Sequence, residues 1–428
     1  MTTATRLGAA MLAAAIGLTA AGCSADSTGS DDTSSTPAAA GSVDLRMTVW
    51  TSNEDQLALF DSIAESYRAE HPEIGSITFE SLPFADYNTT LTTQIAGGNA
   101  PDLAWMGDLS EDLISSDALV PLTEKLQDTE GWNYDDLLDS VTAEFSDGDE
   151  LYAYPFSNSP FALYVNTDLL AQAGQTLPAD GLTWEDVSTI GAAVNAATGK
   201  GGFVLRDFDY ASWNVLGTVW PGWGAAAWSE DGTECTFDSP EMTEAFRFLH
   251  DAAFVDGSMP GPGTTADFFA GDSAFTVAQV SRASLLDGSF AYDVVPLPEG
   301  PAGEYSVIGQ AGVGVLSSSD HVEEATDFLA YLTNPENAAL LAQYFPPPRE
   351  SLLTGEALAA NNPKLTAEQL QTVVVDRIPD AVTLPNHANP AEIAQKGKTA
   401  LDAMWTADAD VEAVLGSVCD AIQPLLSR

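Results

Sequence analysis

Residues 148–170 read GDELYAYPFSNSPFALYVNTDLL, and the interpretation of the whole chain depends on them. After a Gly-Asp turn, a short apolar run ends at Phe156, a polar break covers residues 157–160, and a second apolar run ends at Val165. Two strands separated by such a break could form a hairpin. They could also be one extended segment that leaves one lobe and enters another, and the flanking sequence favours this second interpretation.

Helix starts follow this stretch directly. Asn166 and Thr167 are good N-cap residues, and the helix that they open would stop at Gly174. A Pro-rich turn comes next, and Thr183 is the expected N-cap of another helix. Elements of this kind belong to a second α/β unit rather than to a hairpin.

The chain before this stretch alternates strands with helices. Strands are expected at residues 45–50, 76–82 and 100–106. The first intervening helix would stop at His71-Pro72, and the second would cover residues 86–96. Strand, helix, strand, helix, strand at this spacing indicates a parallel, doubly wound sheet.

Several of these motifs resemble those of sugar-binding proteins of ABC importers. The segments DELYAYP, LYVNTDLL and LTWED match the family's G-K-L-Y-A-x-P, Y-N-K-D-L and T-W-x-E. Residues 86–108, DYNTTLTTQIAGGNAPDLAWMGD, resemble its D-Y-x-x-K-L-x-x-x-I-A-x-G-x-x-P-D-V pattern. The chain therefore resembles extracellular solute-binding protein family 1, the maltose- and trehalose-binding lipoproteins.

The resemblance covers residues 45–427 and implies a two-lobed α/β fold. Each lobe would be a doubly wound, mainly parallel sheet with flanking helices, and the ligand cleft would lie between the lobes. The expected segments are a signal peptide at 1–22, a tether at 23–42, lobe 1 at 43–158 with 293–338, and lobe 2 at 159–292 with 339–428.

The N-terminal segment predicts export and lipidation. Residues 7–21 are apolar after a single Arg, which is typical of a signal peptide and too short for a comfortable membrane span. The Ala-Ala-Gly sequence before Cys23 resembles a lipobox, although a plain secretory signal with a chance Cys is the alternative. Residues 24–42 contain no hydrophobic residue larger than Ala and predict a disordered tether. We therefore expect a protein anchored by lipid to the outer face of the cytoplasmic membrane.

The charge of the chain limits the classes of partner that it can bind. The 63 acidic and 14 basic residues give a formal net charge of −49. Such a surface repels nucleic acid and anionic lipid headgroups, and it disfavours a strongly anionic ligand. Adaptation to solubility or salt explains the acidity better than an acidic docking role does.

Two further cysteines, Cys235 and Cys419, lie in the exported part of the chain. An oxidising location favours a disulfide between them. Two buried free thiols are the alternative interpretation.

Catalytic signatures are missing from the sequence. It contains no G-x-S-x-G, H-E-x-x-H, P-loop or C-x-x-C motif, so we expect no enzyme activity, no cofactor and no metal. The alternative is an extracellular glycan-active enzyme that uses paired carboxylates, and a third class is an adhesin. With 63 acidic residues, carboxylate pairs arise by chance.

The function implied by the resemblance is that of a monomeric substrate-binding lipoprotein. It would capture a neutral sugar, a disaccharide or an oligosaccharide, and deliver it to the permease of an ABC importer. A sugar needs aromatic faces and hydrogen-bonding groups, which are expected at strand ends and nearby loops. The candidates are Asn53, Glu54, Asp108, Asn158, Ser159, Asp209, Tyr210, Trp213, Trp220, Trp223, Gln310 and Arg349.

Among these candidates, we expect Trp223 to be an apolar platform and Asp108 and Arg349 to be polar contacts from the two lobes. Gln310 lies between two glycines, which suggests a close backbone approach. Structural alternatives remain: core packing for Trp213 and Trp220, helix-end roles for Glu54 and Asp108, a turn contact for Asn158, and a surface ion pair for Arg349.

Overall fold

The computed structural model describes residues 42–426, apart from 180, 206–212, 262–265 and 388–389. The strands are β1 (Val43–Val49), β2 (Ile74–Ser81), β3 (Leu103–Met106), β4 (Ser146–Asp147), β5 (Glu150–Leu151), β6 (Tyr154–Asn166), β7 (Gly201–Leu205), β8 (Ser273–Gln279), β9 (Tyr292–Val295), β10 (Val307–Val315) and β11 (Val382–Thr383). The α-helices are α1 (Glu54–Glu70), α2 (Tyr87–Ala96), α3 (Ser110–Ser115), α4 (Thr123–Asp128), α5 (Asp139–Thr142), α6 (Thr167–Gln172), α7 (Trp184–Thr198), α8 (Trp213–Leu216), α9 (Pro240–Phe254), α10 (Val322–Leu332), α11 (Pro335–Leu341), α12 (Gly355–Ala359), α13 (Ala367–Leu370), α14 (Pro390–Leu401) and α15 (Val411–Leu426). Among the helices described, none is long and apolar enough to cross a membrane.

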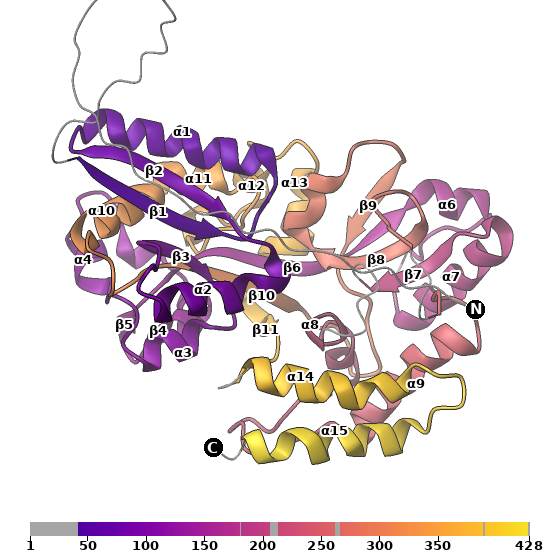
Figure 1. Cartoon of the computed structure of the whole chain (residues 1–428). Coiled ribbons are helices and arrows are strands. Elements are labelled where there is room, and N and C mark those ends of the chain that lie inside the picture. Colours follow the sequence, from indigo (N-terminus) through magenta and orange to yellow (C-terminus); the bar gives the residue numbers. More distant parts are fainter. Residues whose placement is uncertain (1–41, 180, 206–212, 262–265, 388–389, 427–428) are drawn as a thin grey trace, which may run out of the picture. The chain divides into compact units, whose positions relative to one another are not determined.

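One mixed sheet of nine strands runs through the structure in the order β2-β1-β3-β10-β6-β8-β7, with β11 on β10 and β9 on β6 (Figure 1). The pairs β1–β2, β1–β3, β7–β8 and β10–β11 are parallel. The central pairs β3–β10, β10–β6, β6–β8 and β6–β9 are antiparallel. The predicted α/β fold and the parallel arrangement of the first three strands are confirmed.

Strand β6 is a single strand of 13 residues that passes through the predicted polar break. The extended interpretation is therefore confirmed, and the hairpin alternative is wrong. Residues 154–160 of β6 pair with β10, whereas residues 161–166 pair with β8 and β9. Phe156 packs in one hydrophobic core and Phe161 in another. The strand thus joins two separately packed parts of the protein.

These cores define two lobes. The core of the first lobe draws on residues 45–156 and 311–345. Two further cores make up the second lobe, and they include Val294 of β9 and Ile308 of β10. The chain therefore returns to the first lobe later than the predicted boundary at residue 293. It also leaves that lobe later than residue 339, because Leu341 and Phe345 pack in the first core.

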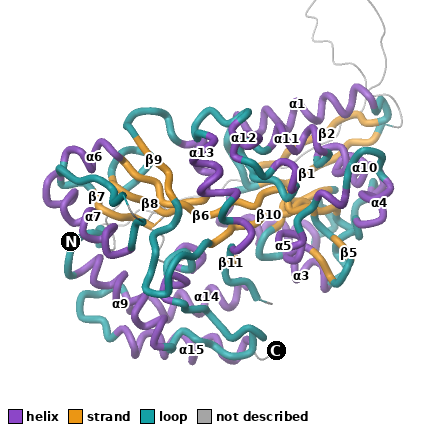
Figure 2. Tube along the Cα trace, turned by 180° about the vertical axis from the view of Figure 1, so that it is seen from behind, coloured by secondary structure: helices purple, strands orange, loops and turns teal. Residues whose placement is uncertain are grey.

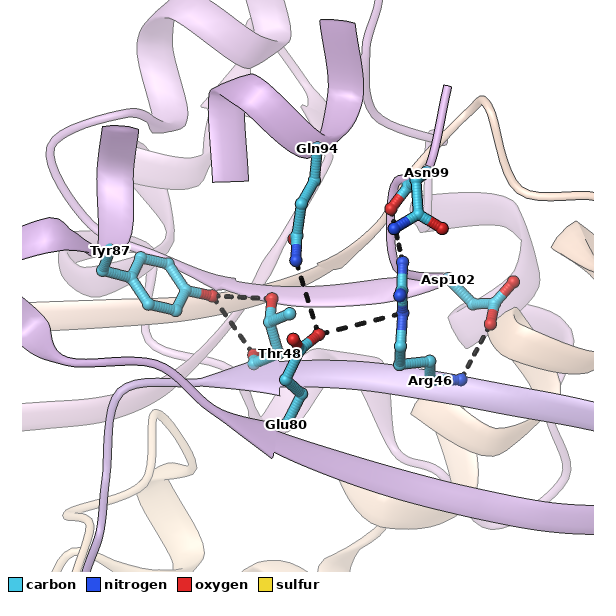
Figure 3. Close-up of polar contacts among 7 residues, drawn as sticks. All are labelled: Arg46, Thr48, Glu80, Tyr87, Gln94, Asn99 and Asp102. Carbon is cyan, nitrogen blue, oxygen red and sulfur yellow. Dashed lines mark hydrogen bonds and ion pairs between the residues drawn. The ribbon is translucent and has the colours of Figure 1, made fainter. Parts of the chain in front are cut away.

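A polar network holds β1, β2, β3 and α2 together in the first lobe (Figure 3). The hydroxyl of Tyr87 donates to the carbonyl oxygen of Trp105 at 2.8 Å and lies 3.0 Å from Thr48 Oγ1. The carboxylate of Asp102 accepts from the backbone N–H of Arg46 at 2.8 Å and from Ser319 Oγ at 2.5 Å. The Tyr and the Asp of the predicted D-Y and P-D motifs therefore fix strand ends.

Helix ends in the second lobe follow the predicted signals. Asn166 caps α6 by accepting from the N–H of Leu169, and Gly174 has a positive φ of 68° after that helix. Thr183 and Asp186 form a capping box at the start of α7. These caps satisfy backbone donors that would otherwise lack partners in the first turn.

The C-terminal helices α14 and α15 lie beside α9 in both views (Figures 1 and 2). A disulfide joins Cys235 to Cys419 of α15, with the two Cα atoms 5.4 Å apart. Gln423 adds two hydrogen bonds to the same segment, because its Oε1 accepts from Cys235 N and its Nε2 donates to Thr233 O. The end of the chain is therefore fastened to the second lobe.

Candidate functional site

A cavity of about 560 Å³ lies between groups from the two lobes. Its first-lobe wall comes from the residues that follow β1 and β3 and from the starts of α1 and α2. Its second-lobe wall comes from the 3₁₀ helix η6 (Val280–Leu285), from Thr383 at the end of β11, and from Leu384 and Asn386 after it. Strands β6 and β10, which cross between the lobes, also contribute residues. The cavity thus lies at strand ends, where ligands bind in open α/β sheets.

Aromatic rings form much of the first-lobe wall. The Trp50 ring is partly exposed and makes edge contacts with Trp105 and Tyr87, each at 5.0 Å between centroids. Phe84 lies at the rim, 5.8 Å from Trp50 and 58 % exposed. Phe156 stacks on Trp105 at 4.6 Å. Rings held in this way offer rigid apolar faces to a ligand.

Polar groups at the start of α1 are held in place by helix capping. Asn53 Oδ1 accepts from the N–H groups of Asp55 and Gln56 at 3.0 and 3.1 Å, which makes Asn53 the N-cap of α1. Gln56 Oε1 accepts from Thr51 Oγ1 at 2.5 Å. Asn53, Gln56 and Thr51 all line the cavity, so the helix cap also orders its polar edge.

Three predicted residues lie close together where β6 pairs with β10. Gln310 Nε2 donates to Asn158 Oδ1 at 2.8 Å and to Val141 O at 2.9 Å, and Gln310 lines the cavity. Asn158 is fully buried and donates to Pro155 O. Ser159 is also buried and accepts from the N–H of Ser281 at 3.0 Å. Asn158 and Ser159 therefore stabilise the region where β6 pairs with β10. Of the three residues, Gln310 is the one that lines the cavity.

Glu144 and Asn386 meet across the cavity. Asn386 Nδ2 donates to Glu144 Oε1 at 2.8 Å, and both residues line the cavity. Burial raises the pKa of Glu144, the hydrogen bond from Asn386 opposes this rise, and the negative charges of Asp108 and Glu111 add to it. Glu144 therefore carries its charge in an unfavourable place, as groups at binding sites often do.

The family model described as bacterial extracellular solute-binding protein matches residues 62–367. The chain belongs to this family. The arabinooligosaccharide-binding protein of Halalkalibacterium halodurans is 24 % identical over 308 residues, which is 68 % of this chain and 67 % of that protein.

Solved structures share the fold of this solute-binding protein. An ABC substrate-binding protein from Listeria monocytogenes, solved in complex with cycloalternan, has a TM-score of 0.79 and 21 % identity, covering 90 % of this chain and 99 % of that one. UgpB from Mycobacterium tuberculosis, solved in complex with glycerophosphocholine, has a TM-score of 0.75 and 20 % identity, covering 91 % and 100 %. At these identities the likeness concerns the fold.

Besides Asn158 and Ser159, four predicted residues of the solute-binding protein lie outside the lining of this cavity. Glu54 is exposed at the first turn of α1, the helix-end role that was its alternative. Trp220 is buried against Phe237 and Phe246, so it is a core residue. Trp223 is partly buried, with its ring 5.1 Å from that of Phe248.

Arg349 is the fourth, and it is fully buried on the first-lobe side. Its guanidinium donates to Asn133 O at 3.2 Å and to Thr333 O at 2.9 Å, and it lies 4.4 Å from the centre of the Trp132 ring. The carboxylate of Asp136 is 3.6 Å away. The structure thus gives Arg349 a packing role in place of the predicted ligand contact, because its donors point into the protein.

Other predicted residues cannot be placed. Cys23, Asp209 and Tyr210 lie outside the described residues. Trp213 begins α8, but its side chain is outside the description. Of the sequence-predicted set, the structure brings Asn53, Asp108 and Gln310 together at the cavity.

The second-lobe wall was missed by the sequence analysis. Gln279, Ser281, Arg282 and Ser284 line the cavity from the end of β8 and from η6. They follow the mainly apolar segment FFAGDSAFTV at residues 268–277. The polar side chains that follow this apolar segment were the available signal.

Proposed function

We propose that this solute-binding protein is the substrate-binding component of a carbohydrate ABC importer. It captures a neutral sugar, a disaccharide or an oligosaccharide, outside the cell and delivers it to a membrane permease. The observation that carries the proposal is the composition of the cavity. Aromatic faces at Trp50 and Phe84 lie with the side chains of Gln310, Asp108 and other hydrogen-bonding residues. Sugars present apolar C–H faces and hydroxyl groups to such surroundings.

The charges around the cavity favour a neutral ligand over a phosphodiester. Among the described lining residues, Arg282 is the one basic side chain, whereas Asp108 and Glu144 are acidic. Phosphate groups are usually bound by several cationic or N–H donors. The arabinooligosaccharide ligand in the name of the Halalkalibacterium protein supports the sugar class. The glycerophosphocholine bound by UgpB provides the competing class for the test.

Isothermal titration calorimetry against arabino- and malto-oligosaccharides, monosaccharides and glycerophosphocholine tests the proposal. Trp50→Ala should weaken sugar affinity by about tenfold or more, because it removes a stacking face equivalent to roughly 1.5–3 kcal/mol. Asp108→Ala should weaken it similarly, by leaving sugar hydroxyls without partners. Binding of glycerophosphocholine alone, or a loss caused by Trp223→Ala and not by Trp50→Ala, would contradict the assigned site.

We further propose that the bound sugar is released unchanged. The family is one of binding proteins, and this chain matches its model over residues 62–367. Asp108 and Glu144 nevertheless both line the cavity, so the test must include them. Chromatography of sugars after prolonged incubation should show no product. Product that disappears in Glu144→Gln would establish the glycan-active enzyme instead.

Export and lipidation at Cys23 complete the proposal. The apolar N-terminal segment, the Ala-Ala-Gly-Cys sequence and the following polar tether support them. The lipid would hold a monomer near its permease. Cys23→Ala should move the protein from the membrane fraction to the medium. Retention of the variant in the membrane fraction at high salt would refute the lipid anchor.

A further inference from the structure

A second cavity, of about 680 Å³, lies next to the first. The two cavities share Glu144, Thr383, Leu384 and Asn386 as lining residues. The second cavity continues between α3 and β4 of the first lobe on one side and residues 217–228 of the second lobe on the other. We call the first cavity the main compartment and the second one the side compartment.

A hydrogen bond between side chains joins two of the four residues that line both compartments. Asn386 Nδ2 donates to Glu144 Oε1 at 2.8 Å, and Asn386 Oδ1 accepts from the N–H of His387. His387 is itself held, because its Nε2 lies 3.0 Å from Gly232 O. Asn386 is thus positioned by its own loop, while the contact to Glu144 involves no backbone pairing. This contact can therefore break by rotation of a side chain, without loss of a backbone hydrogen bond.

The side compartment has the same kinds of lining groups as the main one. Trp228 presents a partly exposed ring, which contacts the His387 ring edge-on at 5.4 Å, and Pro221 adds a second apolar surface. Ser115 and Ser146 offer hydroxyl groups, and Glu111 and Asp147 offer carboxylates. Among the described lining residues there is no Lys or Arg. This chemistry suits a neutral polyhydroxylated chain.

We propose that the side compartment is a second part of the ligand site, which binds the further units of an oligosaccharide too long for the main compartment. Glu144 and Asn386 separate when such a chain passes between them, and their freed polar groups bind its hydroxyls. The inference rests on the proposed carbohydrate function and adds chain length to it. Short sugars would occupy the main compartment alone.

Filling the side compartment from its rim tests this proposal. Ser115→Trp and Ala226→Trp each place a ring at an exposed position that lines the side compartment, from opposite lobes. Ser116→Trp is the matched control, because Ser116 is also exposed and also donates to Asp112 O, but does not line the compartment. Affinities are measured by calorimetry for malto- and arabino-oligosaccharides from disaccharide to hexasaccharide, on the full mature protein.

In wild-type protein, affinity should rise by about tenfold or more between the short and the long sugars. Ser115→Trp and Ala226→Trp should abolish that rise and leave the affinity for short sugars unchanged, whereas Ser116→Trp should behave as wild type. Equal losses at every length, or no loss at any length, would overturn the second part of the site while leaving the carbohydrate function intact. Failure of wild-type protein to bind any of these sugars would overturn both.

Discussion

Glu144 is a carboxylate whose position is unfavourable for its charge. Its pKa is raised above the ordinary value of 4.5, chiefly by burial. Between the unfolded and folded pKa values, the folded protein therefore holds more protons than the unfolded chain. Stability falls as the pH rises through this interval, and the loss persists at higher pH.

Glu144→Gln should remove this loss, because the amide cannot ionise and its carbonyl oxygen can still accept from Asn386. The melting temperature of the variant, relative to wild type, should be higher near pH 8 than near pH 4. Differential scanning fluorimetry over this range measures the difference, and the other titrating groups cancel between the two proteins. Parallel melting curves at all pH values would show that burial does not penalise this charge.

Arg349 illustrates the opposite case, a buried charge whose two terminal nitrogens have partners. Arg349→Ala should lower the free energy of unfolding by about 3–5 kcal/mol, since it leaves Asp136 and two carbonyl groups without their cation. Arg247→Ala is the control, because the ion pair of Arg247 with Glu412 is exposed and should contribute less than about 1 kcal/mol. Urea denaturation measures both.

Sugar affinity separates this packing role from the predicted ligand contact. Folded Arg349→Ala protein should bind sugar like wild type. Unchanged stability with lost affinity would restore the ligand contact that the sequence suggested.

Among individual residues, the sequence predicted only part of the candidate site. Of the residues that line the cavity, Asn53 and Asp108 were chosen because they follow predicted strands, and Gln310 because of the nearby glycines. Trp223 and Arg349 were chosen by residue type and by their place in loops, and neither reveals which way a side chain points. Glu144 and Asn386 are 242 positions apart, so only the folded chain brings them together.

Among the elements, β10 shows how glycine permits close packing. A Cβ atom at Gly312 would lie 2.7 Å from Cε1 of the buried Phe145 ring and 3.1 Å from the Cβ of Ala153. At Gly309 it would lie 2.2 Å from Nε2 of Gln279, the mobile end of a long side chain. The close approach suggested for the glycines around Gln310 is therefore present.

The two glycines should differ when each is replaced by alanine. Gly312→Ala should destabilise the protein by about 1–3 kcal/mol, because a packed ring must shift. Gly309→Ala should cost about 1 kcal/mol or less, since Gln279 can change rotamer, but sugar affinity should fall because Gln279 lines the main compartment. Chemical denaturation and calorimetry on both variants check this. Equal effects on stability would mean that the Phe145 ring moves away from the added methyl group as easily as the Gln279 side chain does.

The secondary-structure elements are the features of this protein that the sequence predicted best. The N-terminal strands, the caps at Asn166 and Thr183 and the unbroken β6 follow from local patterns of polarity and capping. Antiparallel pairing at the centre of the sheet and the points where the chain returns between lobes depend on contacts between distant segments. Local patterns do not contain that information.

For the whole molecule, the disulfide fastens the C-terminal helices to the second lobe. It closes a loop with a sequence separation of 184, so its removal should lower stability by about 2–5 kcal/mol. The double variant Cys235→Ser, Cys419→Ser should melt at a lower temperature than wild type. Dithiothreitol should lower the melting temperature of wild type and leave that of the variant unchanged. Two titratable thiols in denatured, unreduced mature protein would refute the bond.

Strand β6 has a consequence for how this molecule survives outside the cell. If one lobe opened alone, half of the strand would keep its neighbours and the adjoining half would lose its backbone partners, which is costly. We therefore expect the lobes to melt as a single cooperative unit, which would leave few half-open molecules for extracellular proteases to cut. Damage to either lobe should accordingly shorten the lifetime of the whole receptor.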